Sequence, residues 1–273
     1  MSTFGDEYIL QSGRSGHDRL RVIGEIHDCQ TRELLGRARL GAGARYVEFG
    51  CGLGYVTRWA ASQGAQATGI DLSQDQVAEA GRLALEAGLE NVEFRVASIY
   101  EHGFAPESFD YSYSRWLLVH LSRPVEAMRK IYEALKPGGV MVCEEADLTA
   151  IYTEPRASAY EEFRDLAVAG GDQRGVDYSG GRRVHSWARE AGFEVLYTNA
   201  YQPQYREGAH KGFWSWTFVE AGASLVQAGV LSEERLRELA GGMRAADEDP
   251  DVIVAHSRMH QLIARKPLGG VRK

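Results

Sequence analysis

Short apolar stretches alternate with amphipathic ones along the first 150 residues. Val92, Phe94 and Val96 alternate with polar residues, whereas the other apolar stretches are continuous and short, as in buried strands. The expected strands cover residues 45–49, 67–70, 91–97, 109–114 and 140–143. Regular alternation of strands and helices predicts an α/β fold with a mostly parallel sheet.

Helix signals fill the gaps between these strands. Apolar residues recur at helical spacing over residues 17–40, which predicts one or two amphipathic helices before the first strand. Ser73 and Gln76 form a capping box at the start of a later helix, and Gly88 closes it. Pro124 suits the first turn of a helix that ends near residue 135.

The second half of the chain is less regular. Helical stretches over residues 152–192 are interrupted by glycines, Gly170-Gly171 among them, which is typical of a cover that bends. The remaining expected elements are a helix over residues 225–239 and strands over residues 193–198 and 252–264. We expect these segments to complete the sheet and to cover one end of it.

A glycine-rich turn follows the first strand. Gly50, Gly52 and Gly54 remove side chains at every second position, so the backbone can approach a ligand closely and the next helix can present its N–H groups. The second strand ends at Asp71, near the spacing at which nucleotide-binding folds place a carboxylate on ribose hydroxyls. A dinucleotide fingerprint starting at Gly50 requires glycine at position 55, where this chain has Tyr55.

Four motifs together resemble a known family. They read Glu48-Phe49-Gly50-Cys51-Gly52-Leu53-Gly54, Gly69-Ile70-Asp71-Leu72-Ser73, Ser108-Phe109-Asp110 and Leu135-Lys136-Pro137-Gly138-Gly139. Their order and spacing over residues 40–150 resemble those of class I S-adenosylmethionine-dependent methyltransferases. The resemblance implies a Rossmann-like fold with a mostly parallel seven-stranded sheet flanked by helices and a helical cover. It also implies S-adenosylmethionine as cofactor and S-adenosylhomocysteine as product.

Three parts are expected within a single domain. Residues 1–40 form an N-terminal arm and cap helices, residues 41–150 form the cofactor-binding core, and residues 151–273 form the rest of the sheet with the substrate cover. The arm contains an apolar island around Tyr8, which is compatible with an arm that folds over the cofactor or onto a neighbouring subunit of a homo-oligomer, and equally with a frayed terminus.

The resemblance assigns cofactor contacts to the glycine turn, to the ribose acid and to further strand ends. The expected cofactor residues are Tyr8, Gln30, Glu48, Gly50, Cys51, Gly52, Asp71, Leu72, Gln76, Ala97, Ser98, Ile99, Ser114, Arg115 and Trp116. At Ala97-Ser98 the chain departs from the family, because many members carry an acid there beside the adenine amino group. That contact must come instead from the Ser98 hydroxyl, from backbone groups or from apolar neighbours.

The acceptor is expected at the ends of the fourth and fifth strands and beneath a later aromatic-rich insertion. The expected substrate residues are Trp116, Glu145, Tyr178, Tyr201, Phe213 and Trp214. If the acceptor atom is oxygen or nitrogen, a general base is expected, and the candidates are His120, Glu145, His210 and His185. If the acceptor atom is an electron-rich carbon, aromatic faces stabilise the resulting cation without taking a proton.

The aromatic insertion favours a flat, hydrophobic acceptor. The whole-chain pattern resembles small-molecule methyltransferases of bacterial secondary metabolism, including the terpenoid C-methyltransferases of indole-alkaloid (teleocidin) assembly, in which methylation triggers ring closure. The alternative is O- or N-methylation of a small metabolite. A protein that binds the cofactor without methylating, or a nicotinamide oxidoreductase, is a second alternative.

Composition narrows the range of partners. The net charge of −7 and a pI near 5.7 argue against a nucleic-acid-binding surface, which needs clustered Lys and Arg. The 3 cysteines are too few and too scattered for a disulfide framework, and no cysteine pair indicates a metal site. The first residues lack a signal-peptide pattern and no segment reaches the length of a membrane span, so we expect a cytoplasmic protein.

Overall fold

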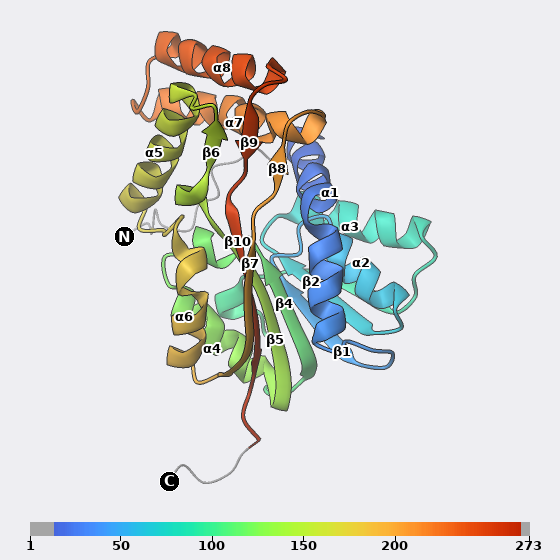
Figure 1. Cartoon of the computed structure of the whole chain (residues 1–273). Coiled ribbons are helices and arrows are strands. Elements are labelled where there is room, and N and C mark those ends of the chain that lie inside the picture. Colours follow the sequence, from blue (N-terminus) through green and yellow to red (C-terminus); the bar gives the residue numbers. More distant parts are fainter. Residues whose placement is uncertain (1–13, 269–273) are drawn as a thin grey trace.

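A computed structural model describes residues 14–268 of the chain. Its centre is a seven-stranded sheet in the order β3-β2-β1-β4-β5-β10-β7 (Figure 1). The strands are β1 (Arg45–Phe49), β2 (Gln66–Asp71), β3 (Val92–Val96), β4 (Phe109–Arg115), β5 (Leu135–Asp147), β7 (Glu194–Tyr201) and β10 (Arg258–Arg265). Strands β1 to β5 pair in parallel, and β10 runs antiparallel to both of its neighbours. The predicted Rossmann-like fold class is confirmed.

Helices cover both faces of this sheet (Figure 1). One face carries α1 (Arg14–Arg37), α2 (Tyr55–Ser62) and α3 (Gln74–Glu86), and the other carries α4 (Pro124–Ala134) and α6 (Val184–Glu190). On the first face, Leu35 and Val56 are buried with Tyr46. On the second face, Met128 and Trp187 are buried with Phe49. The alternating side chains of β1 therefore belong to two separate apolar layers, as the two-residue period of a strand requires.

A helical cover lies beyond the carboxyl ends of the parallel strands (Figure 1). It consists of α5 (Ser158–Gln173), α7 (Phe213–Gln227), α8 (Glu233–Glu248) and a three-stranded sheet in the order β6-β9-β8. The small strands are β6 (Tyr152–Glu154), β8 (Gln204–Tyr205) and β9 (Ile253–Ala255). Short 3₁₀ turns complete the described chain: η1 (Ile99–Glu101), η2 (Leu118–His120), η3 (Leu148–Ala150), η4 (Gly180–Arg183) and η5 (Ala209–Gly212).

Two expectations about the second half are wrong. Residues 252–264 do not form one strand, because the chain leaves the small sheet after β9 and joins the large sheet as β10. At this crossing the backbone N–H of His256 donates to the Pro203 carbonyl, and the His256 carbonyl accepts from the side-chain amide of Gln202. The backbone therefore stays hydrogen-bonded between the two sheets. The helix expected over residues 225–239 is two helices, α7 and α8, separated at Gly229, which has a φ of 69°.

The glycine pair expected to break the cover lies inside α5 instead. Gly171 is buried, and a Cβ on it would sit 2.7 Å from the Tyr178 ring. This glycine therefore permits close packing of a helix against an aromatic ring rather than a bend. One or two helices are expected over residues 17–40, and the structure has one, α1.

Candidate functional site

The glycine turn after β1 lies at the carboxyl edge of the parallel strands, where open α/β sheets bind their ligands. Gly50, Gly52 and Gly54 have φ values of 71°, 52° and 67°, a region that L side chains rarely adopt. The amides of Gly50 and Cys51 both donate to the Ile70 carbonyl, at 2.8 and 2.9 Å. The turn is thus tied to β2, and its bare backbone forms one wall of the crevice.

Asp71 is held by the same turn. One carboxylate oxygen accepts from the Gly52 amide at 2.9 Å, and the other accepts from the Ser73 amide at 3.0 Å. Burial raises the pKa of the Asp71 carboxyl, and these backbone N–H groups oppose that shift. Each oxygen keeps a second lone pair for an external donor such as a ribose hydroxyl. Leu72, the next residue, is 62% exposed, which suits an apolar ligand surface beside the acid.

Tight packing behind the turn explains its last glycine. A Cβ on Gly54 would sit 2.4 Å from the Phe94 ring, and a Cβ on Gly69 would sit 2.7 Å from the same ring. Cys51 is buried there, and burial raises the pKa of its thiol well above the usual value. Gln76 is buried in the first turn of α3, where its amide donates to the Ser73 hydroxyl in the predicted cap.

Glu48 is fully enclosed behind the turn. The Thr57 hydroxyl donates to its carboxylate, and burial raises the pKa of Glu48 to about 8. A neutral carboxyl group is therefore the main form at pH 7. Glu48 lies at the end of β1, as predicted. Its side chain, however, bonds Thr57 of α2 and does not face an open crevice.

The end of β3 carries the residues expected beside adenine. The Ala97 amide donates to the Asp71 carbonyl at 3.0 Å, which fixes this segment to the ribose acid. The Ser98 hydroxyl accepts from the Tyr100 amide and caps η1, while Ile99 is buried in the sheet core. The Ser98 hydroxyl can still donate one hydrogen bond, as the departure from the family pattern requires.

The end of β4 ties α1 to the sheet. The Arg115 guanidinium bonds Asp28 at 3.1 Å and the Thr31 hydroxyl at 2.9 Å. Although burial alone would lower it, the nearby Tyr113, Asp28 and Glu144 side chains raise the pKa of Arg115 above its usual value. Ser114 is also buried, and Gln30 contributes a carbonyl that accepts from the Gln261 amide at 3.5 Å. The side chains of Ser114 and Arg115 thus lie inside the fold.

Trp116 begins the loop that faces the cover. Its φ is 56°, which costs about 1–2 kcal/mol for a residue with a Cβ, so the surrounding structure must impose it. The Glu145 carboxylate supplies that constraint, because it accepts from the amides of Leu117, Leu118 and Val119 at 3.1, 2.9 and 3.3 Å. Burial raises the pKa of Glu145 to about 7, and the three amides oppose this. Glu145 thus lies behind the loop and shapes it.

An aromatic cluster surrounds this loop. The Trp116 ring lies 6.0 Å from Trp214 and 6.4 Å from His120, and His120 lies 5.3 Å from Tyr178. Phe213 adjoins Trp214 at 5.0 Å. The predicted acceptor residues among them come from the loop after β4, the segment before η4 and helix α7, and the fold brings them into one apolar cluster.

Tyr201 lies at the margin of this cluster. Its hydroxyl is 3.0 Å from His27 Nδ1, which anchors the end of β7 to α1. Burial raises the pKa of Tyr201 above its usual value and lowers the pKa of His27. The Tyr201 contact is therefore one more link between α1 and the sheet.

The candidate bases differ in their surroundings. Burial lowers the pKa of His120 to about 3, and the positive charges of Arg174 and Arg19 lower it further. His210 lies in η5, 2.9 Å from the Glu25 carboxylate, and His185 is exposed on α6. The structure does not bring these histidines together, and Tyr8 lies outside the described residues.

His256 is a site residue that sequence reasoning missed. It is 2% exposed and its ring lies 6.1 Å from Trp214 and 5.8 Å from Phe213. The signal was a polar His-Ser pair inside an apolar stretch, which also marks the crossing between β9 and β10.

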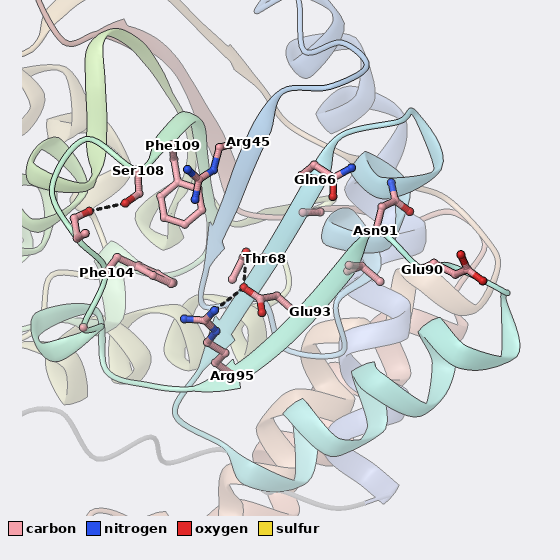
Figure 2. Close-up of a pocket in the computed structure, with 14 residues that line it drawn as sticks. Arg45, Gln66, Thr68, Glu90, Asn91, Glu93, Arg95, Phe104, Ser108 and Phe109 are labelled. Carbon is pink, nitrogen blue, oxygen red and sulfur yellow. Dashed lines mark hydrogen bonds and ion pairs between the residues drawn. The ribbon is translucent and has the colours of Figure 1, made fainter.

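A groove of about 450 Å³ lies at the other edge of the sheet. Figure 2 shows Arg45, Phe109 and Gln66, the first residues of their strands, around it. The Arg95 guanidinium bonds Glu93 at 2.7 Å across the groove floor. Because open α/β sheets bind ligands at the carboxyl ends of their strands, we do not assign the cofactor to this groove.

Among residues 14–268, no group of His, Cys, Asp and Glu side chains is arranged to hold a metal ion. The same described residues contain no helix that is both long and apolar enough to cross a membrane.

Comparison with known proteins shows similarity to methyltransferases. Residues 47–143 match the family model of a methyltransferase domain. An O-methyltransferase of Aspergillus sclerotiorum, resE, is 32% identical over 170 residues, which cover 61% of each chain. The 24-methylenesterol C-methyltransferase 2 of Oryza sativa subsp. japonica is 31% identical over 67% of this chain and 48% of its own length. The match thus spans less than two thirds of the length of these curated relatives.

A solved structure shares most of the fold. The [4+2]-cyclase SpnF is 26% identical, with a TM-score of 0.60 over 89% of this chain and 81% of that one. The matched region, 47–143, contains the glycine turn, Asp71 and the loop start at Trp116. Over residues 47–143 the chain is therefore similar to known methyltransferases, and this similarity supports S-adenosylmethionine as the cofactor.

Proposed function

We propose that the protein transfers a methyl group from S-adenosylmethionine to a small, largely apolar natural product held beneath the aromatic cover. The observation that carries this proposal is the Trp116 loop, which joins the strand next to the cofactor turn to the ring cluster of Trp214 and Tyr178. Such a cluster supplies apolar contact area to a flat molecule.

The main task of the protein side chains is to align the acceptor with the methyl group of the cofactor. When bound, S-adenosylmethionine supplies a methyl group already activated by a sulfonium charge. Holding two reactants as near-attack partners is worth about 7–11 kcal/mol. The loop constrained by Glu145 and the buried cluster around Trp214 are rigid features that support such alignment.

Carbon methylation followed by cyclisation is the form of this proposal in which the methyl-transfer step needs no base. The cation left by methyl transfer forms a carbon–carbon bond to the indole ring, and the ring then loses a proton to solvent, so that the product is heavier by one methylene. Glu145 bonds three amides, and a His120 pKa near 3 makes it a weak base at neutral pH. The faces of Trp116 and Trp214 would stabilise positive charge on an alkylated carbon. We extend the proposal to a terpenoid carbon on an indole alkaloid of the teleocidin type. O- or N-methylation with His210 or Glu145 as base is the alternative.

Cyclisation without methyl transfer is a second candidate function. The observation that favours it is the 26% identity with a solved [4+2]-cyclase over 89% of this chain. Such a protein shares every cofactor residue with a methyltransferase, so only product analysis separates the two. A nicotinamide oxidoreductase fits less well, because Tyr55 stands where the third glycine is needed.

The test is turnover with a panel of prenylated indoles, phenols and amines. Mass spectrometry of each reaction should show S-adenosylhomocysteine formed in equal amount to a product heavier by one methylene. An isomerised acceptor without S-adenosylhomocysteine would establish the cyclase instead. We also propose a cytoplasmic location and a homo-oligomer joined through the N-terminal arm, residues 1–16. Gel filtration of full-length and arm-deleted protein would test the oligomer.

A further inference from the structure

Three nitrogen atoms inside the aromatic cluster lack a hydrogen-bond partner within residues 14–268. They are Nε1 of Trp116, Nε1 of Trp214 and Nε2 of His256, and each atom is buried. The rings follow one another, with centroids 6.0 Å apart from Trp116 to Trp214 and 6.1 Å apart from Trp214 to His256. Trp214 is 5% exposed and His256 2% exposed, so bulk water does not satisfy them.

Several other polar groups of the cover are paired, although the buried Ser257 hydroxyl, next to His256 in the chain, has no partner within the described residues. The Asp247 carboxylate accepts from the hydroxyls of Tyr160 and Ser215, and the buried Lys211 ammonium donates to the Asp249 carbonyl. A buried polar group left without a partner costs about 1–3 kcal/mol. Three such atoms in adjoining rings indicate a place where a ligand completes the hydrogen bonds.

The chemistry of the three atoms restricts the ligand. Burial lowers the pKa of His256 to about 3, so the ring is neutral at pH 7. Hydrogen bonds to the backbone of His210 and Lys211 engage its other nitrogen, which leaves Nε2 with a lone pair that needs a donor. The indole N–H groups of Trp116 and Trp214 can only donate, so they need an acceptor.

A hydroxyl group is the simplest group that does both. It donates one hydrogen bond and accepts two, whereas an ether or ketone offers nothing to the imidazole lone pair. A carboxylate is disfavoured because it too lacks a proton for His256 Nε2. The surrounding surface is apolar and aromatic, since Tyr205 and Phe213 lie 5.0 and 5.8 Å from the imidazole ring.

We propose that His256 and Trp214, with Trp116, form a subsite that recognises a hydroxyl group on an otherwise apolar acceptor. This inference rests on the proposed function, because the hydroxyl belongs to the acceptor of methyl transfer. It specifies that acceptor as a hydroxylated aromatic or terpenoid molecule. His256 acts here as a binding residue. The hydroxyl is the group that orients the acceptor beneath the cover.

The test compares phenol with toluene, which has nearly the same shape and no hydroxyl. Full-length protein with ¹⁵N-labelled indoles is titrated with each probe in the presence of S-adenosylhomocysteine. The Trp116 and Trp214 resonances are assigned with the W116F and W214F variants. We expect phenol to bind about tenfold tighter than toluene, as one or two hydrogen bonds allow, and to shift the Trp214 indole resonance downfield. Anisole, which accepts but cannot donate, should bind between the two.

Two variants assign the preference to the subsite. His256→Phe and Trp214→Phe should each reduce the preference for phenol over toluene at least about threefold, since each removes one hydrogen-bonding atom and keeps an aromatic ring. Trp59→Phe is the matched control, because Trp59 packs with the α2 layer, and it should keep the full preference. Circular dichroism and S-adenosylhomocysteine affinity check that each variant is folded.

Equal binding of phenol and toluene would overturn the proposal. So would undetectable binding of phenol, or a preference that survives in both His256→Phe and Trp214→Phe. The proposed function fails on a different result, namely no methylated product from any acceptor. A protein that binds phenol through His256 but forms no S-adenosylhomocysteine would retain the subsite and lose the methyl transfer.

Discussion

The half proposed to hold the cofactor (the cofactor half) and the cover half are assembled by different means. In residues 45–116 the crevice is formed by bare backbone at Gly50 and Gly52 and by one carboxylate, Asp71, all within 22 positions of one another. In the cover the proposed acceptor site consists of side chains from distant segments, including Tyr178, Trp214 and His256. A cofactor site that is local in sequence can serve many acceptors, whereas a nonlocal cover sets the acceptor.

Gly54→Ala should have the largest effect, and it falls on the cofactor half. The new Cβ would meet the Phe94 ring at 2.4 Å and hold a φ of 67°. Overpacking and left-handed strain together should lower the free energy of unfolding by about 2–5 kcal/mol in urea denaturation. Gly81→Ala in α3 is the control, because nothing lies within 4 Å of its Cβ position. It should stabilise by about 0.5–1 kcal/mol, and equal effects would refute the packing argument.

Asp71→Ala should have the next largest effect. It removes a ligand for the ribose and releases the amides of Gly52 and Ser73, so S-adenosylhomocysteine affinity should fall about 100-fold. Thermal shift with and without S-adenosylhomocysteine measures this loss. Asp110→Asn at the opposite edge should leave the affinity unchanged. An unaltered thermal shift in Asp71→Ala would remove the ribose assignment.

Two buried glutamates should make the protein less stable as pH rises. The pKa of Glu145 is about 7 and that of Glu48 about 8, both above the usual glutamate value of 4.5. From pH 7 to 8.5 the folded state holds about one proton more than the unfolded state, so the free energy of unfolding should fall by about 2 kcal/mol. Urea denaturation across this range measures the slope.

Neutral variants divide that slope between the two halves. Glu48→Gln should remove most of the slope between pH 7 and 8.5, and Glu145→Gln should remove a smaller part that lies mainly below pH 7.5. Glu86→Gln, which alters an exposed carboxyl, should leave the slope intact. A stability that is flat or rises with pH would show that these carboxyls are ionised in the folded state.

Trp214→Phe should have the smallest effect on the cofactor. It alters the cover but not the turn, so S-adenosylhomocysteine affinity should change less than about twofold, while the KM for an acceptor should rise. Isothermal titration and acceptor kinetics on one preparation separate the two quantities. A large loss of cofactor affinity would mean that the halves are coupled through the Trp116 loop.

The predictable parts are those with local physical causes. The turn at Gly50, Gly52 and Gly54 has positive φ values, which favour glycine. Ser73 caps α3 by accepting a hydrogen bond from the Gln76 amide, as its capping-box motif predicts. Both features can be inferred from residues adjacent in the sequence. The mostly parallel seven-stranded sheet also followed from the resemblance, and the structure has it.

The remaining features depend on contacts distant in sequence. The apolar run of residues 252–264 has the composition of one strand, but the pairing of β9 with β6 and β8 divides it at His256. Glu145 is a residue type that can act as a base. Its three hydrogen bonds from the amides after Trp116 could not be predicted from its position in the sequence, because those amides lie 26 to 28 residues before it. His256 escaped notice because its neighbours in space lie about 40 positions away.

The central claim is that the backbone turn and Asp71 hold S-adenosylmethionine. Parallel calorimetric titrations with S-adenosylmethionine, S-adenosylhomocysteine and NADH test it most directly. The account predicts micromolar binding of the first two and no heat of binding from NADH. Binding of NADH without either adenosyl compound would contradict it.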